Sequence, residues 1–216
     1  MIEILSPGML TTVQDLGREG FGPIGVSASG AADMLALRLG NRLLGNTDCS
    51  AALEMTILGG KFRFPQGATI AITGSDFGAS VAMWRTLVIA PGETVAFGHT
   101  KTGARCYLCI AGGIDAPLWL GSASAHLHSG FGGGPIKKGD VLEVGPAHDV
   151  RAAHVNLQHD RTVLRVTPGL QGQGLTGTYR VTEEANRLGI RLEGESVTPL
   201  VASIISEGAQ IGRAHV

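Results

Sequence analysis

The stretch that decides the fold begins at Thr11 and reads T-T-V-Q-D-L-G-R-E-G-F-G-P-I-G-V-S-A-S-G-A-A-D, ending at Asp33. Its first half is a glycine-broken turn with polar side chains, and its second half leads into a helix. Amides at the start of a helix have no partners within it and can bind an anion, so this stretch is the first place to look for chemistry. The residues that carry this expectation are Gln14, Asp15, Arg18, Ser29, Gly30 and Asp33.

One helix is predicted in the first half of the chain, over residues 31–44. Ser29 is a suitable N-cap, because its hydroxyl can accept a hydrogen bond from a first-turn amide. Gly45 and Asn46 supply a left-handed end to the helix. The apolar side chains expected along its buried stripe are Leu35, Leu39 and Leu43.

Short apolar runs between glycine- and proline-rich turns fill most of the remaining first unit, and residues 9–28 are predicted to be a loop. Strands that recur every roughly 8–12 residues with turn signals indicate an all-β barrel or sandwich. The fold class is therefore mainly β, with one clear helix. The predicted strands lie at residues 2–5, 51–58, 61–64, 69–73, 80–84, 87–89, 93–97, 105–111 and 141–144.

Composition excludes several classes of function. The net charge is −1 with no basic run, which argues against a nucleic-acid partner, because phosphate binding needs clustered Lys and Arg. The apolar runs are strand-sized and far shorter than a membrane span, and residues 1–8 lack the pattern of a secretion signal. Three cysteines cannot all pair internally, so we predict a protein of the reducing cytoplasm.

The chain is expected to contain two subdomains. The first covers residues 1–148, and the polar segment 146–161 is the expected linker. A second unit over residues 162–209 is short for an independent core, so we predict that it is incomplete.

Three further patterns carry less weight. Residues 20–25 match G-x-G-x-x-G by letter, but no strand precedes them and no helix follows directly, so a dinucleotide site is not predicted. Cys106 and Cys109 have C-x-x-C spacing, yet residues three apart on a strand point to opposite faces, which predicts two buried structural thiols. His126 and His128 would share a strand face, but no third ligand is evident and no metal site is predicted.

Four carboxylates are candidates for a functional role. Asp76 and Asp115 lie in glycine turns, where turn-stabilising hydrogen bonds are the common role of Asp. Glu54 is unusual, because a carboxylate within an apolar strand must be paired, lie at a sheet edge, or be used. Asp15 is expected to form a charge-assisted pair with Arg18 that shapes the site.

These motifs together resemble a known family. P-G-M-L-T-T-V-Q-D-L-G-R-E-G over residues 7–20, followed by G-V-S-A-S-G-A-A-D over residues 25–33, is similar to the C component of 5-oxoprolinase, a family also called allophanate hydrolase subunit 2 and KipA. The similarity continues through T-G-S-D at residues 73–76, Y-L-C-I-A-G-G-I-D-A-P at residues 107–117 and N-R-L-G-I-R-L-E-G at residues 186–194. It covers essentially the whole chain.

The resemblance implies a fold, partners and an activity. It implies two cyclophilin-like β-barrel subdomains acting with the B and A subunits in an ATP-dependent 5-oxoprolinase that opens 5-oxoproline to glutamate. It also leaves two alternatives open: the carboxyltransferase component of a biotin-dependent urea or amide carboxylase, and a non-catalytic regulator that binds a kinase-inhibitor protein. We expect ATP in the assembled complex, and biotin under the carboxyltransferase alternative.

The site that we predict on this basis joins both subdomains. Ser29 and Gly30 amides would hold a carboxylate or phosphate, and one of three carboxylates would be the general acid or base. The predicted catalytic residues are Asp15, Arg18, Glu54, Asp76 and Asp115. The predicted substrate-binding residues are Gln14, Ser29, Gly30, Asp33, Asn186, Arg187 and Arg191.

The sequence departs from the family pattern in two kinds of place. Ala123 and Gly134 stand where arginines are expected, and neither can bind an anion bidentately as a guanidinium does. The family pattern is also expected to continue beyond Gln210, whereas residues 210–216 read Q-I-G-R-A-H-V, which resembles a translated sequencing adapter. We therefore expect a truncated second subdomain with an artefactual tail.

Overall fold

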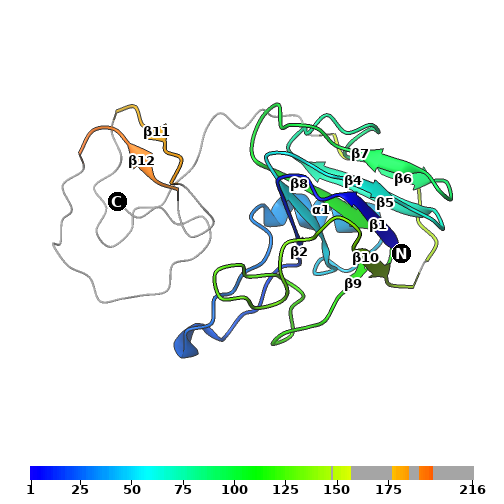
Figure 1. Cartoon of the computed structure of the whole chain (residues 1–216), viewed down its shortest axis with the longest axis horizontal. Helices are drawn as coiled ribbons and strands as arrows, with labels where there is room; N and C mark the ends of the chain where they lie inside the picture. The colour runs from blue at the N-terminus through cyan, green and yellow to red at the C-terminus, as the bar shows by residue number, and fades with distance from the viewer. Residues whose placement is uncertain (147, 157–176, 185–189, 197–216) are drawn as a thin grey trace. The chain divides into compact units, whose positions relative to one another are not determined.

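The computed structural model describes residues 1–146, 148–156, 177–184 and 190–196 (Figure 1). The chain divides into two compact units, Met1–Leu157 and Gln158–Val216. The division falls within the polar segment 146–161 that was expected to be a linker. The subdomain boundaries and the incompleteness of the second subdomain stay predictions.

The first unit contains two antiparallel sheets of five strands each, in the orders β7-β4-β1-β10-β9 and β2-β3-β8-β5-β6. The first sheet consists of β7 (Thr94–Ala96), β4 (Lys61–Arg63), β1 (Ile2–Ser6), β10 (Val141–Val144) and β9 (Ile114–Asp115). The second consists of β2 (Leu10–Gln14), β3 (Ala52–Thr56), β8 (Arg105–Ile110), β5 (Ala68–Gly74) and β6 (Thr86–Ile89). The mainly β fold with one α-helix is confirmed, but over the described residues the strands form two sheets and no closed barrel.

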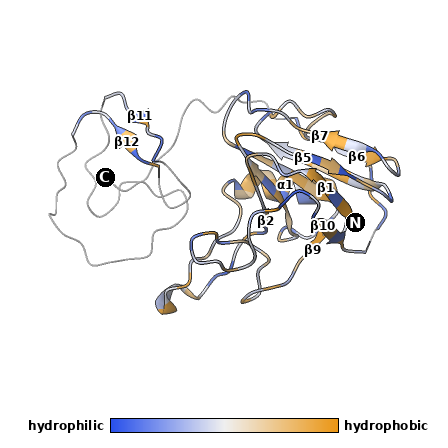
Figure 2. Ribbon diagram, in the orientation of Figure 1, coloured by the Kyte–Doolittle hydropathy of each residue, from blue (hydrophilic) through white to orange (hydrophobic). Residues whose placement is uncertain are grey.

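The main hydrophobic core lies between these two sheets. Ile4 and Phe62 enter it from the first sheet, and Leu53, Met55 and Leu108 enter it from the second, all essentially inaccessible to solvent. Each such side chain stabilises the fold by about 1.5–3 kcal/mol through its removal from water. Figure 2 shows the hydropathy of the residues along these strands.

A second, smaller core lies on the other face of the second sheet, beneath helix α1 (Met34–Leu43). Leu37 and Leu44 pack there against Tyr107 and Cys109 of β8. Cys106 belongs instead to the core between the sheets. The two thiols thus occupy opposite faces of β8 and are both buried, which confirms the prediction made from their spacing.

Helix α1 begins three residues later than we predicted. Asp33 is its N-cap, and the Asp33 carboxylate accepts a hydrogen bond of 3.0 Å from the Ala36 amide. Ser29 cannot fill that role, because it lies before the helix with a φ of 54°. Leu35 is 45% exposed, so the predicted leucine stripe is wrong at this position, whereas Leu43 is buried as predicted. The buried positions of the helix are Ala36, Leu37, Gly40, Asn41 and Leu43.

The end of α1 matches the prediction. Gly45 has a φ of 69°, and its amide donates to the Arg42 carbonyl oxygen at 3.1 Å. The Asn46 amide then returns to the Asn41 carbonyl oxygen at 3.0 Å. These bonds satisfy carbonyl oxygens that the last helical turn leaves unpaired.

Two strand predictions fail for identifiable reasons. Residues 10–14 were predicted to be loop but form β2. Thr12 and Gln14 lie on its α1 side, where they form a hydrogen bond of 3.0 Å. Because these buried side chains are polar, the alternation of apolar and polar residues that indicates a strand is absent. Residues 80–84 were predicted to be a strand but have no regular structure. Trp84 has a φ of 58° there, which is incompatible with a strand.

The described part of the second unit contains one hairpin. β11 (Arg180–Val181) pairs with β12 (Leu192–Glu193) in antiparallel register, and Arg180 and Glu193 face each other across it in an ion pair of 3.0 Å. No described helix is long and apolar enough to cross a membrane.

Candidate functional site

The Asp15 carboxylate lies directly after β2 and accepts several hydrogen bonds from its own chain. Its Oδ1 accepts from the Gly17 amide at 2.7 Å, from Ser122 Oγ at 2.6 Å and from Ser124 Oγ at 2.5 Å. Its Oδ2 accepts from the Ala123 amide at 2.7 Å. A carboxylate offers about four acceptor positions, and Asp15 accepts four hydrogen bonds from its own chain. Its geometry is that of an anchor for residues 122–124 and not of an exposed base.

Arg18 connects the same loop to the stretch before α1. Its Nε donates to the Trp119 carbonyl oxygen at 3.1 Å, and Nη2 donates to the Ser124 carbonyl oxygen at 2.6 Å. Nη1 donates to Ser29 Oγ at 3.1 Å, and the guanidinium lies 5.8 Å from the centroid of the Phe131 ring. One buried side chain therefore holds two loops that are far apart in the sequence, as the separation of 101 between Arg18 and Trp119 shows.

The expected direct pair between Asp15 and Arg18 is wrong. Within the described residues, the hydrogen bonds of Arg18 go to neutral oxygens, and Asp15 receives its own from amides and hydroxyls. Burial lowers the pKa of the Arg18 guanidinium below its usual range, while the negative charge of Asp15 acts in the opposite direction. The two charges act on each other through space and not through a direct ion pair.

Glu54, on β3, supplies the anion at the start of α1. Its Oε2 accepts from the Ala32 amide at 2.8 Å and from the Tyr107 hydroxyl at 2.7 Å, and that hydroxyl accepts from the Asp33 amide at 2.7 Å. Its Oε1 lies 3.6 Å from Arg105 Nε. Burial, and next the charge of Glu54, raise the pKa of Tyr107, which therefore stays a neutral donor. The buried carboxylate is paired, as its place in an apolar strand required.

The amides just before α1 are consequently occupied by the protein itself. The Ala31 amide donates to the Asp15 carbonyl oxygen at 2.8 Å, and those of Ala32 and Asp33 serve Glu54 and Tyr107. The idea that this helix start is free for a ligand anion is not supported by this geometry. The role of Ser29 and Gly30 in substrate binding stays a prediction.

Gln14 is buried next to this cluster. Its Nε2 donates to Thr12 Oγ1 and to the Ala125 carbonyl oxygen, both at 3.0 Å. Within the described residues its Oε1 has no hydrogen-bond partner. The amide therefore ties β2 to the loop that follows Ser124.

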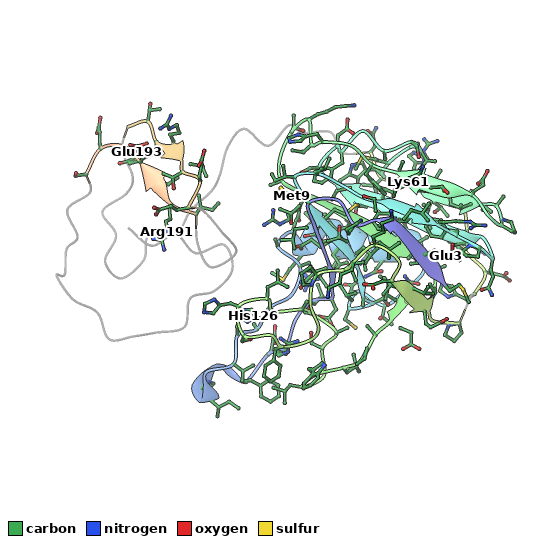
Figure 3. The ribbon with its side chains drawn as sticks, in the orientation of Figure 1. Glu3, Met9, Lys61, His126, Arg191 and Glu193 are labelled. Carbon is green, nitrogen blue, oxygen red and sulfur yellow. The ribbon has the colours of Figure 1, made fainter. Side chains whose placement is uncertain are left out.

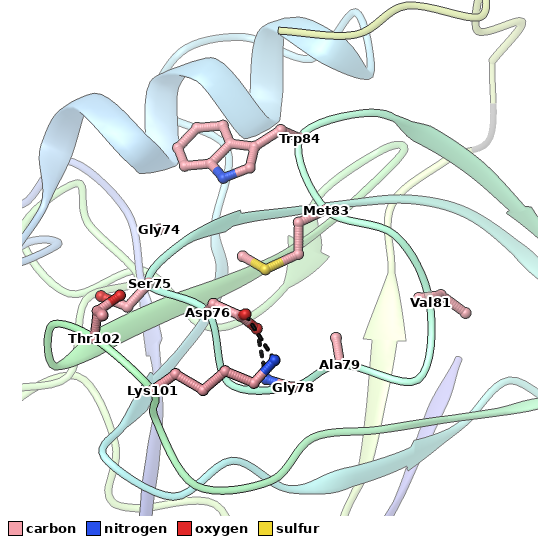
Figure 4. Close-up of a pocket in the computed structure, with 10 residues that line it drawn as sticks. All are labelled: Gly74, Ser75, Asp76, Gly78, Ala79, Val81, Met83, Trp84, Lys101 and Thr102. Atoms are coloured by element: carbon pink, nitrogen blue, oxygen red, sulfur yellow. Dashed lines mark hydrogen bonds and ion pairs between the residues drawn. The ribbon is translucent and has the colours of Figure 1, made fainter. Parts of the chain in front are cut away.

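A pocket of about 540 Å³ lies elsewhere, around Asp76 (Figure 4). We call it the Asp76 pocket; its lining comes from residues 74–84 and 101–102. The Asp76 carboxylate accepts from Lys101 Nζ at 2.9 Å and from the Gly78 amide at 2.7 Å. The hydrogen bond from Lys101, and next that from Gly78, lower the pKa of Asp76 below its usual range. Asp76 is therefore an ionised and accessible acceptor.

The structure separates Asp76 from Asp15. Gly74 lies two residues before Asp76, at the end of β5. Across the sheet it is aligned with Thr11 near the start of β2, through Cys106 of β8 and Met55 of β3. Asp15 follows the opposite end of β2, at a distance of more than about 13 Å given a rise of ~3.3 Å per residue. The two carboxylates belong to different places on the sheet and do not form one site.

The remaining predicted residues are Asp115 in the first unit and Asn186, Arg187 and Arg191 in the second. Asp115 is exposed on β9, opposite Glu143 of β10. Arg191, beside β12, lies with its Nε 3.8 Å from Glu184 Oε2 (Figure 3). Asn186 and Arg187 lie outside the described residues.

Sequence reasoning missed four residues that complete these arrangements, namely Lys101, Tyr107, Ser122 and Ser124. Ser122 and Ser124 are fully buried, and a pair of serines inside a glycine turn was the available signal. Ala123 between them belongs to the main core, so its side chain faces the sheets. At Gly134 an added Cβ meets no atom within 4 Å, so an arginine there would have open space.

The two thiols of β8 are buried, and His126 contacts a serine of its own loop. Burial raises the pKa of the Cys109 thiol to about 12 and that of Cys106 further still, so both stay protonated. His126 Nδ1 lies 2.6 Å from Ser129 Oγ, and its ring is 6.4 Å from that of His128, centroid to centroid. Within the described ranges, no three His, Cys, Asp or Glu side chains are grouped to hold a metal.

Comparisons with known proteins agree with this fold. The family model described as carboxyltransferase domain, subdomain A and B, matches residues 24–216. The C component of 5-oxoprolinase from Escherichia coli is 34% identical over 90% of this chain and 69% of its own length. Urea amidolyase of Lachancea kluyveri is 33% identical over 89% of this chain but 12% of its own length.

Solved structures give the same result. The crystal structure of TTHA0988 superimposes with a TM-score of 0.83 at 30% identity, over 91% of this chain and 79% of that one. The K. lactis urea amidolyase superimposes with a TM-score of 0.73 at 30% identity, over 90% of this chain and 14% of that one. The chain therefore belongs to the carboxyltransferase family of subdomains A and B.

Proposed function

We propose that this chain is the C component of an ATP-dependent 5-oxoprolinase, which acts with A and B subunits to open 5-oxoproline to glutamate. The observation that carries the proposal is the 34% identity with the E. coli C component of 5-oxoprolinase, which extends over 90% of this chain and 69% of the relative. A second relative of that name, from Haemophilus influenzae, is 31% identical over the whole chain. We place the complex in the cytoplasm.

We assign ATP binding to the partner subunits. The glycine loop of residues 20–25 does not fit phosphates, because its amides bond to its own carbonyl oxygens. Ile24 donates to the Phe21 carbonyl oxygen at 3.1 Å, and Gly25 donates to that of Gly22 at 2.9 Å. Amides engaged in this way cannot also surround a phosphate group.

Exposed apolar side chains support a role within a larger complex. Ile24 is 73% exposed, and Leu118 and Trp119 are 68% and 51% exposed. They lie on the two loops that Arg18 joins, and the Trp119 ring packs edge-to-face on Phe131 at 5.6 Å. Large exposed apolar groups on loops are typical of protein–protein contacts. We propose that these loops contact the B subunit.

The proposed site is therefore simpler than the one predicted from sequence. Asp15, Arg18 and Glu54 act by positioning loops and the start of α1, since their polar atoms are engaged within the chain. Asp76 is left as the accessible carboxylate that lines a pocket. Roles for Asp115, Asn186, Arg187 and Arg191 stay predictions.

The test is reconstitution of the complex. The chain is co-expressed with A and B subunits, and ATP-dependent release of glutamate from 5-oxoproline is measured. We expect clear stimulation over A plus B alone, retained by Asp48→Asn, which removes only an exposed ion pair with Arg42. Trp119→Ser combined with Ile24→Ser should abolish co-purification with B. An unstimulated A–B pair would reject the proposal.

The similarity to urea amidolyase favours one second candidate, a carboxyltransferase component of a biotin-dependent urea or amide carboxylase. Biotin carries a neutral ureido group, and Asp76 and Lys101 present an acceptor beside a donor that fits it. If the reconstituted complex transfers carboxyl groups from carboxylated biotin to urea and releases no glutamate from 5-oxoproline, this candidate replaces the first.

A further inference from the structure

The Asp76 pocket has one polar wall and one apolar wall (Figure 4). Ser75, Asp76, Lys101 and Thr102 form the polar wall, and the apolar wall is formed by Ala79, Val81, Met83 and Trp84. The Met83 and Trp84 side chains face the Asp76–Lys101 pair from the α1 side (Figure 4). A ligand in this space therefore meets polar groups at one edge and carbon along its other surface.

Residues 75–84 form most of the pocket wall, and backbone hydrogen bonds hold both ends of this segment against the sheet. The Ser75 amide donates to the Arg105 carbonyl oxygen at 2.7 Å, and the Trp84 amide donates to that of Ile72 at 2.7 Å. Between them Phe77 is fully buried in the main core. The pocket is thus formed before any ligand arrives, which reduces the entropic cost of binding.

The charges of the pocket select the chemical class of ligand. Asp76 and Lys101 form a neutral pair with an Nζ–Oδ2 distance of 2.9 Å. An ammonium has three donors and a carboxylate has about four acceptor positions, so each partner retains capacity for a further hydrogen bond. An anionic group placed against this pair would be repelled by Asp76, and a cationic group by Lys101. A neutral group with a donor beside an acceptor satisfies both partners.

We propose that the Asp76 pocket binds a neutral amide whose N–H and C=O lie on the same edge, as in a lactam or a ureido group. The N–H donates to the Asp76 carboxylate, the C=O accepts from Lys101 Nζ, and the carbon skeleton lies against Met83 and Trp84. The inference rests on the proposed function in that both candidate reactions act on such a group. An ordinary secondary amide is trans and holds its N–H and C=O on opposite edges, so it can engage only one partner.

The ionisation of the pair agrees with this role. The hydrogen bond from Lys101 lowers the pKa of Asp76, so the carboxylate stays an acceptor at neutral pH. The carboxylate can consequently hold and orient the amide by accepting its N–H.

The two tryptophans of the chain make the test direct. Trp84 lines the pocket, whereas Trp119 lies on the loop held by Arg18. The indole N–H resonances of the full chain are followed by ¹H–¹⁵N NMR during titration with 2-pyrrolidinone, with urea and with biotin methyl ester. We expect saturable shifts of the Trp84 signal while the Trp119 signal stays in place. The ligand that binds most tightly identifies the lactam or the ureido class as the natural one.

Matched probes and variants isolate the two hydrogen bonds. N-Methylacetamide, acetate and methylammonium should bind at least about tenfold more weakly than the preferred cis amide. Asp76→Asn and Lys101→Met should each weaken binding by about tenfold or more, because each removes one charged partner. The matched control is Asp48→Asn, which breaks an exposed ion pair with Arg42 of α1 and should leave the titration unchanged.

Several outcomes overturn the inference. These are an absence of Trp84 shifts at millimolar ligand, equal shifts of both tryptophans, equal affinity for N-methylacetamide, or unchanged binding in the Asp76 variant. The reconstituted enzyme separates this proposal from the proposed function. If 5-oxoproline is hydrolysed with an unchanged KM in Asp76→Asn, the pocket proposal fails and the function stands. If the probes bind but no reconstituted activity is found, the function fails and the pocket proposal stands.

Discussion

Glu54 was predicted as a possible catalytic residue, but its contacts in the structure are those of a residue that stabilises the fold. A carboxylate among apolar strand neighbours must be paired, because an unpaired buried charge is very costly. The structure gives it the Tyr107 hydroxyl and the Ala32 amide, with Arg105 Nε at 3.6 Å. Through these contacts Glu54 joins the sheet to the start of α1. These contacts point to a stabilising role, whereas the sequence was compatible with either a stabilising or a catalytic one.

Replacing Glu54 should therefore reduce stability before it alters chemistry. We expect Glu54→Ala to lower the free energy of unfolding by about 3–5 kcal/mol, because Arg105 and two donors lose their partner. Glu54→Gln keeps a carbonyl oxygen near both donors and should cost about 1–3 kcal/mol. Urea denaturation followed by fluorescence measures both values.

Glu3→Ala provides the control for this series. Glu3 forms an exposed ion pair with Arg63 at 3.4 Å, which is worth about 0–1 kcal/mol. A Glu54→Ala chain as stable as the wild type, but inactive in the reconstituted complex, would reverse our interpretation and restore Glu54 as a catalytic candidate.

At this scale the sequence indicated which polar residues are unusual but not their partners. Asp15 and Arg18 are close in sequence and opposite in charge, so a direct pair was the simple expectation. Besides the nearby Gly17 amide and Ser29 hydroxyl, their partners come from residues 119–124, with sequence separations of 101–109. Only the tertiary fold determines such contacts, and no local pattern reports them.

At the scale of elements, Gly40 controls how closely α1 approaches the second sheet. A Cβ added there would lie 2.5 Å from Cys109 Sγ and 3.0 Å from Thr73 Oγ1. Thr73 Oγ1 in turn donates to the Ala36 carbonyl oxygen at 2.8 Å, which fixes the helix against β5. The close approach is therefore specific and leaves no room for a methyl group.

Gly40→Ala should consequently destabilise the protein, although alanine favours helices by about 1 kcal/mol over glycine. Overpacking of this kind costs about 1–3 kcal/mol, so we expect a net loss of stability in urea denaturation. Removing Sγ by Cys109→Ala in the same chain should recover part of the loss. Arg38→Ala, at an exposed position of α1, should change stability by at most ~0.5 kcal/mol. A stabilised Gly40→Ala chain would contradict the packing argument.

Prediction of the elements succeeded where burial follows a simple period. β1, β10 and the glycine end of α1 were found because apolar alternation and turn residues report them directly. β2 was missed because its face toward α1 carries the polar residues Thr12 and Gln14. The Gln14 side-chain amide donates to the Thr12 hydroxyl and to the Ala125 carbonyl oxygen in the loop beyond Ser124. Buried polar strands of this kind look like loops until their partners are known.

At the scale of the molecule, both hydrophobic cores belong to the first unit. The core between the sheets and the core under α1 together use residues from Ile2 to Val155, all before the division at Leu157. A fold of this kind carries its own stability, because the apolar area that it buries lies within one continuous stretch of chain.

We therefore predict that residues 1–157 fold alone. Both tryptophans, Trp84 and Trp119, lie within this fragment and report on different parts of it, so the expected result is one cooperative urea transition by tryptophan fluorescence and dispersed amide resonances by NMR. The Asp76 pocket lies wholly inside the fragment, so its cis-amide titration should match that of the full chain. A fragment that binds hydrophobic dyes and lacks near-UV circular dichroism would show that the first unit needs the remainder of the chain to complete its packing.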